Sequence, residues 1–238
     1  MIVFLDKKKM FMMILGIFCF SAILCTGMNN TKESIMTAST PVTSRVIVLD
    51  AGHGKPDEGA ESENGVTEEK TNLDIVLKLQ KLLEESGSTV ILTRSDENGI
   101  YDLDKETLRE KKVSDIENRV KIGNESSADI FVSVHLNKGT DAEYCGFQTF
   151  YKETDDSSHR LAKCIQDELK STINEENRRT ENKISGIYII DNVEIPTAIV
   201  ECGFLSNPQE EQKLLTDEYQ NELAWGIYSG ILTYFNSN

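Results

Sequence analysis

The sequence has few basic residues for its acidic content, with 25 Lys and Arg against 40 Asp and Glu and a formal net charge of −15. A nucleic-acid-binding protein needs a basic face that neutralises phosphates, so this balance argues against a nucleic-acid partner. The sequence also lacks both glycine-rich phosphate motifs, GxxxxGK(S/T) and GxGxxG. The glycines around residue 52 are therefore not interpreted as a nucleotide-binding loop.

Cysteines are scarce, and their spacing shows no pairing pattern. Of the five, Cys19 and Cys25 lie in an apolar N-terminal segment, which leaves Cys145, Cys164 and Cys202. Three is an odd number, and no CxxC pair or disulfide-framework spacing is present. The sequence therefore predicts no disulfide bridge that activity requires.

The N-terminal segment differs from the rest of the chain. Three lysines at positions 7–9 precede an apolar run over residues 10–25. This pattern predicts that residues 1–27 are a secretory signal or an N-terminal membrane anchor, and in either case contact the membrane. Residues 28–44 form a polar linker, and residues 45–238 are expected to be one catalytic domain outside the cytoplasmic membrane.

Strand and helix patterns alternate along the predicted domain, which indicates an α/β fold with a largely parallel sheet. The apolar periodicity predicts strands at residues 45–50, 89–93, 129–135, 146–151, 186–190 and 197–201. It predicts helices at residues 68–86, 104–126 and 157–172, and a closing helical region at 209–235. Gly87 is expected to end the first helix.

Histidine is rare, and two of the three histidines come at predicted strand ends. His53 follows the first strand in a glycine-rich turn, and His135 ends the third apolar strand. Each alone fits a turn or core histidine as well as a metal ligand, but ligands of open α/β sheets bind beyond the carboxyl ends of strands. His159 lies in a polar helix start and is expected to be a surface residue without a role.

Carboxylates could complete a site with these histidines. Glu68 opens the first helix after the His53 loop, and by physical chemistry alone Glu69 is an equal candidate, since both suit a first helical turn. Glu201 ends a buried strand, where an ionised carboxylate is costly unless it is paired or faces a metal. Glu201 is therefore the best candidate for a general base.

Two histidines, one carboxylate and an open position form a catalytic zinc site. A zinc ion held there would lower the pKa of its water to about 7 and polarise a scissile carbonyl. Glu201 would take the proton of that water and pass it to a leaving amine. The set therefore suits amide hydrolysis.

Five motifs in this order resemble the zinc-dependent N-acetylmuramoyl-L-alanine amidases of the amidase-3 type. They are VIVLDAGHG (46–54), EEKTNL (68–73), VILTR (90–94), FVSVHLN (131–137) and PTAIVECGFLSNP (196–208). The resemblance runs from about residue 45 to the end of the sequence. It implies a three-layer α/β/α fold with a mixed, mostly parallel six-stranded sheet.

The resemblance also implies the roles of individual residues. His53 and His135 correspond to the two histidine ligands of one zinc ion per domain, and Glu201 corresponds to the catalytic glutamate. Counting five residues back from Leu73 gives Glu68 as the acidic ligand, although the family's next lysine is displaced here to Lys70. The implied reaction is hydrolysis of the amide bond between N-acetylmuramic acid and L-alanine in peptidoglycan.

The short single domain further resembles the germination-specific, spore-cortex branch of that family. This branch implies a role in cortex maturation and muramic-δ-lactam formation, in the intermembrane space or cortex of the forespore. The implied partners are glycan strands with stem peptides, a regulatory protein or lipoprotein, and a muramic acid deacetylase that acts in sequence.

Residues 152–156 leave no room for the zinc-plugging helix of some division-associated relatives, so we expect control by expression timing, location or a partner. An alternative hypothesis is a zinc peptidase or carboxypeptidase that trims stem peptides. A non-catalytic wall-binding protein would be marked by loss of a ligand or of Glu201, and neither is lost.

Overall fold

The computed structural model describes residues 40–173 and 177–237. The predicted signal or anchor at 1–27 and most of the predicted linker lie outside these residues. The folded unit begins at Thr40, and the Val42 side chain is fully buried in it. Among the described residues, no helix is long and apolar enough to cross a membrane.

Six strands form one mixed sheet in the order β2-β1-β3-β6-β4-β5. All neighbouring strands run parallel except the pair β4 and β6, which runs antiparallel. The predicted six-stranded, mostly parallel sheet is confirmed. Its strands are β1 (Val46–Ala51), β2 (Thr89–Leu92), β3 (Ile130–Asn137), β4 (Gln148–Lys152), β5 (Asn182–Ile184) and β6 (Thr197–Phe204).

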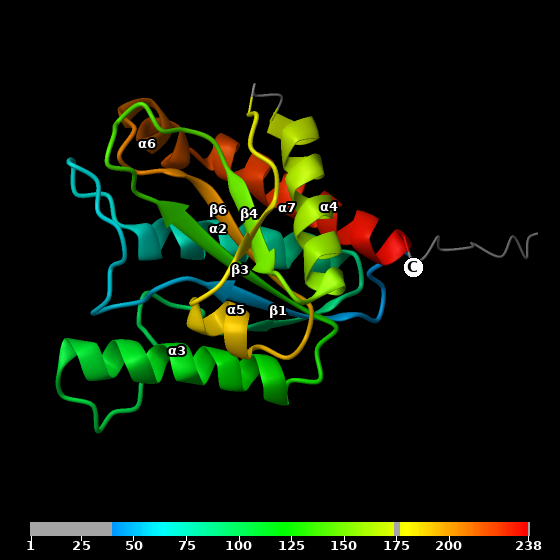
Figure 1. Cartoon of the computed structure of the whole chain (residues 1–238), viewed down its shortest axis with the longest axis horizontal. Helices are drawn as coiled ribbons and strands as arrows, with labels where there is room; N and C mark the ends of the chain where they lie inside the picture. The colour runs from blue at the N-terminus through cyan, green and yellow to red at the C-terminus, as the bar shows by residue number, and fades with distance from the viewer. Residues whose placement is uncertain (1–39, 174–176, 238) are drawn as a thin grey trace, which may run out of the picture. The chain divides into compact units, whose positions relative to one another are not determined.

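Helices cover both faces of the sheet and give the three predicted layers (Figure 1). The face with the larger core carries α2 (Glu68–Glu85), α4 (Asp156–Ile173) and α7 (Asp217–Asn236). The opposite face carries α3 (Leu108–Glu125) and the short α5 (Tyr188–Asn192) over a smaller core. A further short helix, α6 (Pro208–Leu214), follows the last strand.

The central strands are apolar along almost their whole length because both of their faces are covered. Residues 47–51 of β1 and residues 130–134 of β3 are buried without interruption. Helix α2 turns an apolar stripe toward the larger core, and Gly87 follows its end with φ of 88°. Only glycine adopts that left-handed conformation without cost, so the predicted helix stop is confirmed.

Two predicted elements need correction. The strand expected at 186–190 is wrong: the strand is β5, a few residues earlier, and α5 follows it. Ile189 and Ile190 are both buried whereas Ile187 and Tyr188 are exposed, a pattern without the alternation of a strand. The predicted helical region 209–235 is two helices, because Thr216 caps a new start with its hydroxyl accepting from Tyr219 N.

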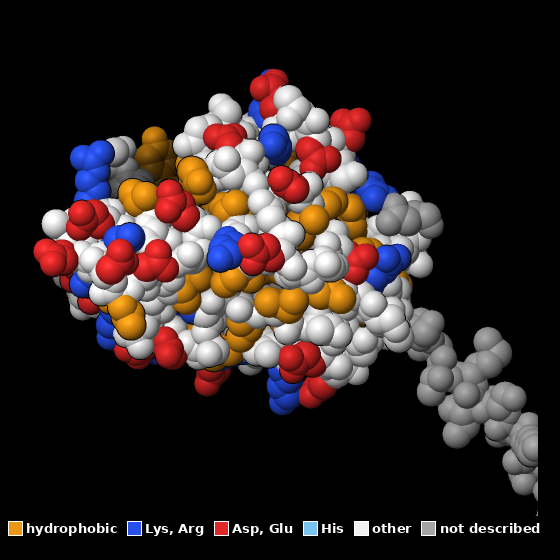
Figure 2. Space-filling model, turned by 90° about the horizontal axis from the view of Figure 1, so that it is seen from below, with side chains coloured by type: hydrophobic (Ala, Val, Ile, Leu, Met, Phe, Trp, Pro, Cys, Tyr) orange, Lys and Arg blue, Asp and Glu red, His pale blue; other side chains and the backbone are white. Residues whose placement is uncertain are grey.

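Figure 2 shows the face that carries α3 and α5. Hydrophobic side chains gather across its middle, with acidic and basic side chains around them. Val113 of α3 and Tyr188 of α5 are about half exposed, at 49% and 43%. This face therefore presents apolar side chains to solvent.

Candidate active site

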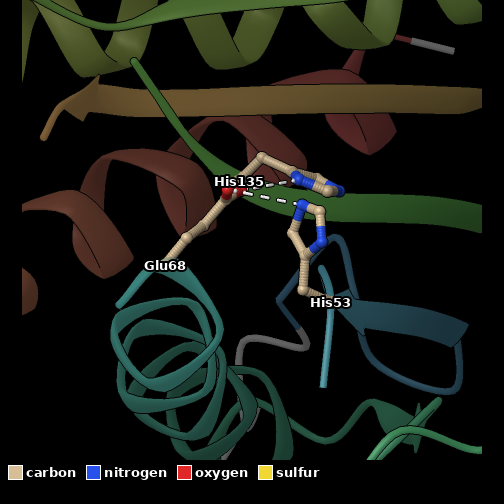
Figure 3. Close-up of side chains that lie close together, drawn as sticks. All are labelled: His53, Glu68 and His135. Carbon is tan, nitrogen blue, oxygen red and sulfur yellow. Dashed lines mark hydrogen bonds and ion pairs between the residues drawn. The ribbon is translucent and has the colours of Figure 1, made fainter. Parts of the chain in front are cut away.

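The site lies at the carboxyl ends of the neighbouring strands β1 and β3. From β1 the chain crosses through α2 on one face to β2, and then through α3 on the other face to β3. Such a reversal opens a crevice between the two strands where ligands of α/β sheets bind. His53 follows β1, His135 lies near the end of β3, and Glu68 opens α2, so all three side chains meet there (Figure 3).

The two imidazoles and the carboxylate converge closely. Each offers one ligand atom, and these atoms all lie within 4.8 Å of one another. Glu68 Oε1 lies 2.9 Å from His135 Nδ1, and Glu68 Oε2 lies 3.3 Å from His53 Nε2. The two rings meet edge to face, with centroids 5.1 Å apart. Glu69 is not among the residues that meet there.

Glu68 is buried but has many donors. Its Oε2 accepts from Ala60 N at 2.8 Å, and its Oε1 accepts from Leu136 N at 3.0 Å and Asn72 Nδ2 at 3.3 Å. Burial alone would raise the pKa of the Glu68 carboxyl, but the hydrogen bonds and charges of His135 and His53 hold it far below its usual range. Glu68 is therefore an ionised carboxylate, as a metal ligand must be.

His53 is held in an unusual backbone conformation. Its φ of 62° lies in the left-handed region that few non-glycine residues adopt. Its Nδ1 lies 2.9 Å from Asp57 Oδ2, and the guanidinium of Arg119 donates to its carbonyl oxygen. Burial would lower the pKa of His53, but the hydrogen bonds to Asp57 and Glu68 raise it to about 9.

A buried ion pair fixes the start of this loop. Arg119 of α3 donates from Nη1 to Asp50 Oδ1 and to Ala51 O, both at 2.6 Å. Thr93 and Ser133 hydroxyls donate to the same Asp50 carboxylate. The side chains of Arg119 and Asp50 are almost fully buried, so this network joins α3 rigidly to the end of β1.

Gly52 allows His135 to occupy its place in the site. A Cβ atom at Gly52 would lie 2.3 Å from Cε1 and 2.4 Å from Nε2 of the His135 ring. Real Cβ atoms do not approach other atoms so closely, so any side chain at this position would displace the imidazole. Glycine is therefore needed at position 52 because of the space that His135 occupies.

Glu201 faces the same crevice from the neighbouring strand. It pairs with His135 in the register of β3 and β6, and both residues line one cavity. Within the described part of the chain, its Oε2 has no hydrogen-bond partner. Burial raises the pKa of the Glu201 carboxyl. An unpartnered buried carboxyl beside ligand-like groups is poised for proton transfer or for a cation.

The cavity at this crevice has a volume of about 420 Å³. Its polar lining consists of the site residues together with residues that include Asp57, Lys112 and Asp115. The apolar part of its lining is formed by Ile116, Phe150, Ile184, Ile187, Ile189 and Ile199. A concave, mostly apolar site with a few convergent polar groups is typical of small-molecule and substrate sites.

The residues present fit a zinc ion. Two imidazoles and one carboxylate are the His₂Glu donor set of catalytic zinc, and they leave a further position open. The Glu201 oxygen without a partner faces the same cavity. His159, by contrast, is stacked on Tyr151 and paired with Glu181 away from this cluster.

Sequence reasoning missed the residues that hold the site. Asp57 lies only four residues after His53 in the same loop, which is the one signal that could have found it. Arg119 and Lys112 lie seven residues apart in a helix that was interpreted only as charged. Their spacing predicts a common face of that helix, but it does not show that this face lies toward the site. Their partners, however, are distant in sequence.

This fold and site define a three-layer α/β enzyme with a candidate metal centre. The chain belongs to the Amidase_3 family, N-acetylmuramoyl-L-alanine amidase, which it matches over residues 47–233. It is a cell-wall amidase that hydrolyses the bond between N-acetylmuramic acid and L-alanine. Family membership decides between the two enzyme hypotheses in favour of the amidase.

The alignments with similar proteins extend over most of the chain. It is 36% identical over 206 residues to the germination-specific N-acetylmuramoyl-L-alanine amidase of Bacillus subtilis, covering 87% of this chain and 86% of that protein. It resembles the CwlD amidase from Clostridioides difficile, solved in complex with the GerS lipoprotein, with TM-score 0.80 and 41% identity over 82% of this chain and 100% of that chain. An N-acetylmuramoyl-L-alanine amidase from Clostridium difficile 630 matches with TM-score 0.72 and 31% identity, over 82% of this chain and 99% of that one.

Proposed function

We propose that the chain binds one zinc ion through His53, Glu68 and His135 and uses Glu201 as the general base of amide hydrolysis. The observation that carries this proposal is the convergence of three ligand atoms within 4.8 Å of one another. Glu201 lines the same cavity and is not one of the three. Glu68, rather than Glu69, is the proposed carboxylate ligand.

The site residues divide the chemistry between them. When bound, zinc supplies Lewis-acid polarisation of the scissile carbonyl and activates a water molecule. Glu201 accepts a proton from the attacking water and returns it to the leaving nitrogen of L-alanine. The cavity is lined largely by apolar side chains. We propose that these side chains contact the methyl groups of the lactyl and alanyl parts of the substrate.

The proposed biological setting is the spore cortex. The names of the Bacillus subtilis relative and of the CwlD structure support a germination-specific role for this chain. In this setting the amidase removes stem peptides, and a muramic acid deacetylase acts on its product in muramic-δ-lactam formation. The complex of CwlD with GerS supports a lipoprotein as a regulatory partner of this chain as well.

The proposed location is outside the cytoplasmic membrane, in the intermembrane space or cortex of the forespore. Residues 1–27 are proposed to export or anchor the chain, with residues 28–39 as part of a linker to the folded unit. Three lysines followed by an apolar run support this assignment. The substrate of a cell-wall amidase also lies in that compartment.

Mass spectrometry of cortex muropeptides tests the biological proposal. Spores of the source organism that lack the chain should contain no muramic-δ-lactam and should keep their stem peptides, while vegetative walls stay unchanged. A plasmid copy should restore the lactam, and a copy carrying Glu201→Gln should not. Normal lactam in the deletion strain would contradict the cortex role.

A further inference from the structure

Two charged residues that take no part in the proposed chemistry hold the side chain of His53. Asp57 Oδ2 lies 2.9 Å from His53 Nδ1, and Lys112 Nζ of α3 lies 2.8 Å from Asp57 Oδ1. The Asp57 backbone also exchanges hydrogen bonds with Gly54, at 2.9 and 3.0 Å. Both carboxylate oxygens and the backbone of Asp57 are therefore fixed.

Asp57, paired with Lys112, determines which nitrogen of His53 carries a proton. An ionised carboxylate can only accept hydrogen bonds, so the proton in the contact must sit on Nδ1 of His53. One oxygen of Asp57 faces His53 Nδ1 and the other faces the ammonium group of Lys112, so both oxygens act as hydrogen-bond acceptors. In the neutral imidazole Nε2 then keeps its lone pair, and Nε2 is the nitrogen near Glu68 Oε2.

We propose that Asp57, itself fixed by Lys112, is a positioning residue that sets the tautomer and ring orientation of His53 for the metal ion. The inference rests on the proposed zinc site. Such a residue matters here because the left-handed backbone of His53 does not by itself hold the ring toward Glu68. Carboxylates behind ligating histidines typically raise metal affinity by about 10–100-fold.

Two other roles for Asp57 make different predictions. As a further zinc ligand it would have to join the cluster, but the atoms that converge belong to His53, Glu68 and His135. As a simple loop fastener it would act through its ion pair with Lys112 of α3 and its weak contact with Gly59 N at 3.3 Å. In that case its loss would lower the melting temperature and leave the zinc affinity of the folded protein unchanged.

Zinc dissociation constants of the purified full-length chain, measured by chelator competition, test the inference. Asp57→Ala should weaken zinc binding by about 10–100-fold. Asp57→Asn should lie between wild type and Asp57→Ala because its amide oxygen can still accept from Nδ1. Lys112→Met should give a smaller loss. Asp167→Ala is the matched control, since it breaks an exposed ion pair with Lys163 on α4, and should bind zinc as wild type does.

Melting temperatures of the metal-free variants and long-range ¹⁵N spectra of the zinc-loaded forms complete the test. The spectra should show a slowly exchanging His53 Nδ1 proton in wild type that exchanges rapidly in Asp57→Ala. If Asp57→Ala binds zinc as tightly as wild type, the role given to Asp57 is wrong but the zinc site is not. The same holds if the loss of zinc affinity is fully explained by a loss of metal-free stability. A wild-type chain that binds no zinc would overturn the metal site as well.

Discussion

Two carboxylates at the active site, those of Glu68 and Glu201, have opposite surroundings. Glu68 accepts hydrogen bonds from two backbone amides and faces both histidines, and its pKa is lowered. Glu201 is buried with one oxygen lacking a partner among the described residues, and burial raises its pKa. When the surroundings of two carboxyl groups shift their pKa values in opposite directions, one group commonly serves as a ligand or charge stabiliser and the other as an acid–base group. The same separation supports the roles proposed here.

Substitution of Glu201 by glutamine tests its role. General acid–base groups contribute about 10²–10⁴-fold in rate, so turnover of Glu201→Gln should fall by at least that much. Glutamine is nearly isosteric, and the three proposed ligands remain, so zinc content and melting temperature should stay as in wild type. Turnover, metal content and melting temperature are measured on the same preparation. A variant with normal turnover per zinc-loaded molecule but lower stability would give Glu201 a purely structural role.

Adjacent glutamates at the start of α2 offer a matched comparison. Glu68 faces the two histidines, whereas the buried Glu69 carboxylate lies outside the cluster. Glu68→Gln should lose bound zinc and activity, and Glu69→Gln should keep most of both. Metal analysis by mass spectrometry on both variants decides the assignment. The reverse pattern would make Glu69 the ligand and would show that the count from Leu73 misleads.

At the scale of elements, α3 is tied to the end of β1 mainly through polar contacts. Arg119 reaches Asp50, Ala51 O and the His53 carbonyl, and Lys112 reaches Asp57. The apolar contact beneath the helix is small, with Val120 as its buried hydrophobic residue. The position of α3 and the shape of the metal-binding loop are therefore coupled.

Removing Arg119 should destabilise the whole domain. Arg119→Met leaves the Asp50 carboxylate buried without its cation, and breaking a buried ion pair in this way costs about 3–5 kcal/mol. Urea unfolding of the metal-free chain at neutral pH measures the difference from wild type. Lys163→Met serves as the control because it breaks an exposed pair, which should change stability very little.

The loss should depend on pH with a definite sign. Burial would raise the pKa of the Asp50 carboxyl, but Arg119 and the Ser133 and Thr93 hydroxyls lower it. Its stabilising contribution is therefore present above the unfolded pKa of about 3.9 and is lost as pH falls through the folded value. In Arg119→Met the carboxyl protonates more readily, so the gap between variant and wild type should shrink on acidification. A constant gap would contradict the pairing.

The end of β6 shows that part of the recognised motif serves structure rather than chemistry. Asn207 caps α6 by accepting from Gln209 N and Glu210 N, and Pro208 occupies the first helical turn. The Glu210 carboxylate accepts from Gly146 N and Phe204 N, which fixes the strand end near Glu201. The residues after Glu201 thus hold the strand that presents it.

At the scale of the whole molecule, the sequence predicted the sheet because its central strands are long apolar runs. It placed His53, His135 and Glu201 near the ends of such strands, and the structure brings the two histidines together with Glu68. It failed at 186–190, where the apolar residues are too few to separate a strand from a helical turn. It could not show that Lys112 and Arg119 support the site, because only the fold brings α3 to the loop, whereas the position of Asp57 four residues after His53 was a usable signal.

The central claim is that this chain cuts the muramoyl–L-alanine bond with a metal held by His53, Glu68 and His135. The most direct measurement is mass spectrometry of products from purified peptidoglycan digested by the metal-free chain, with and without one equivalent of zinc. We expect zinc-dependent release of peptides with free N-terminal L-alanine from the wild-type chain. The His135→Ala variant should neither bind zinc nor release peptides. Trimmed peptides still attached to glycan, or full activity of a His135→Ala variant that keeps one zinc, would contradict the central claim.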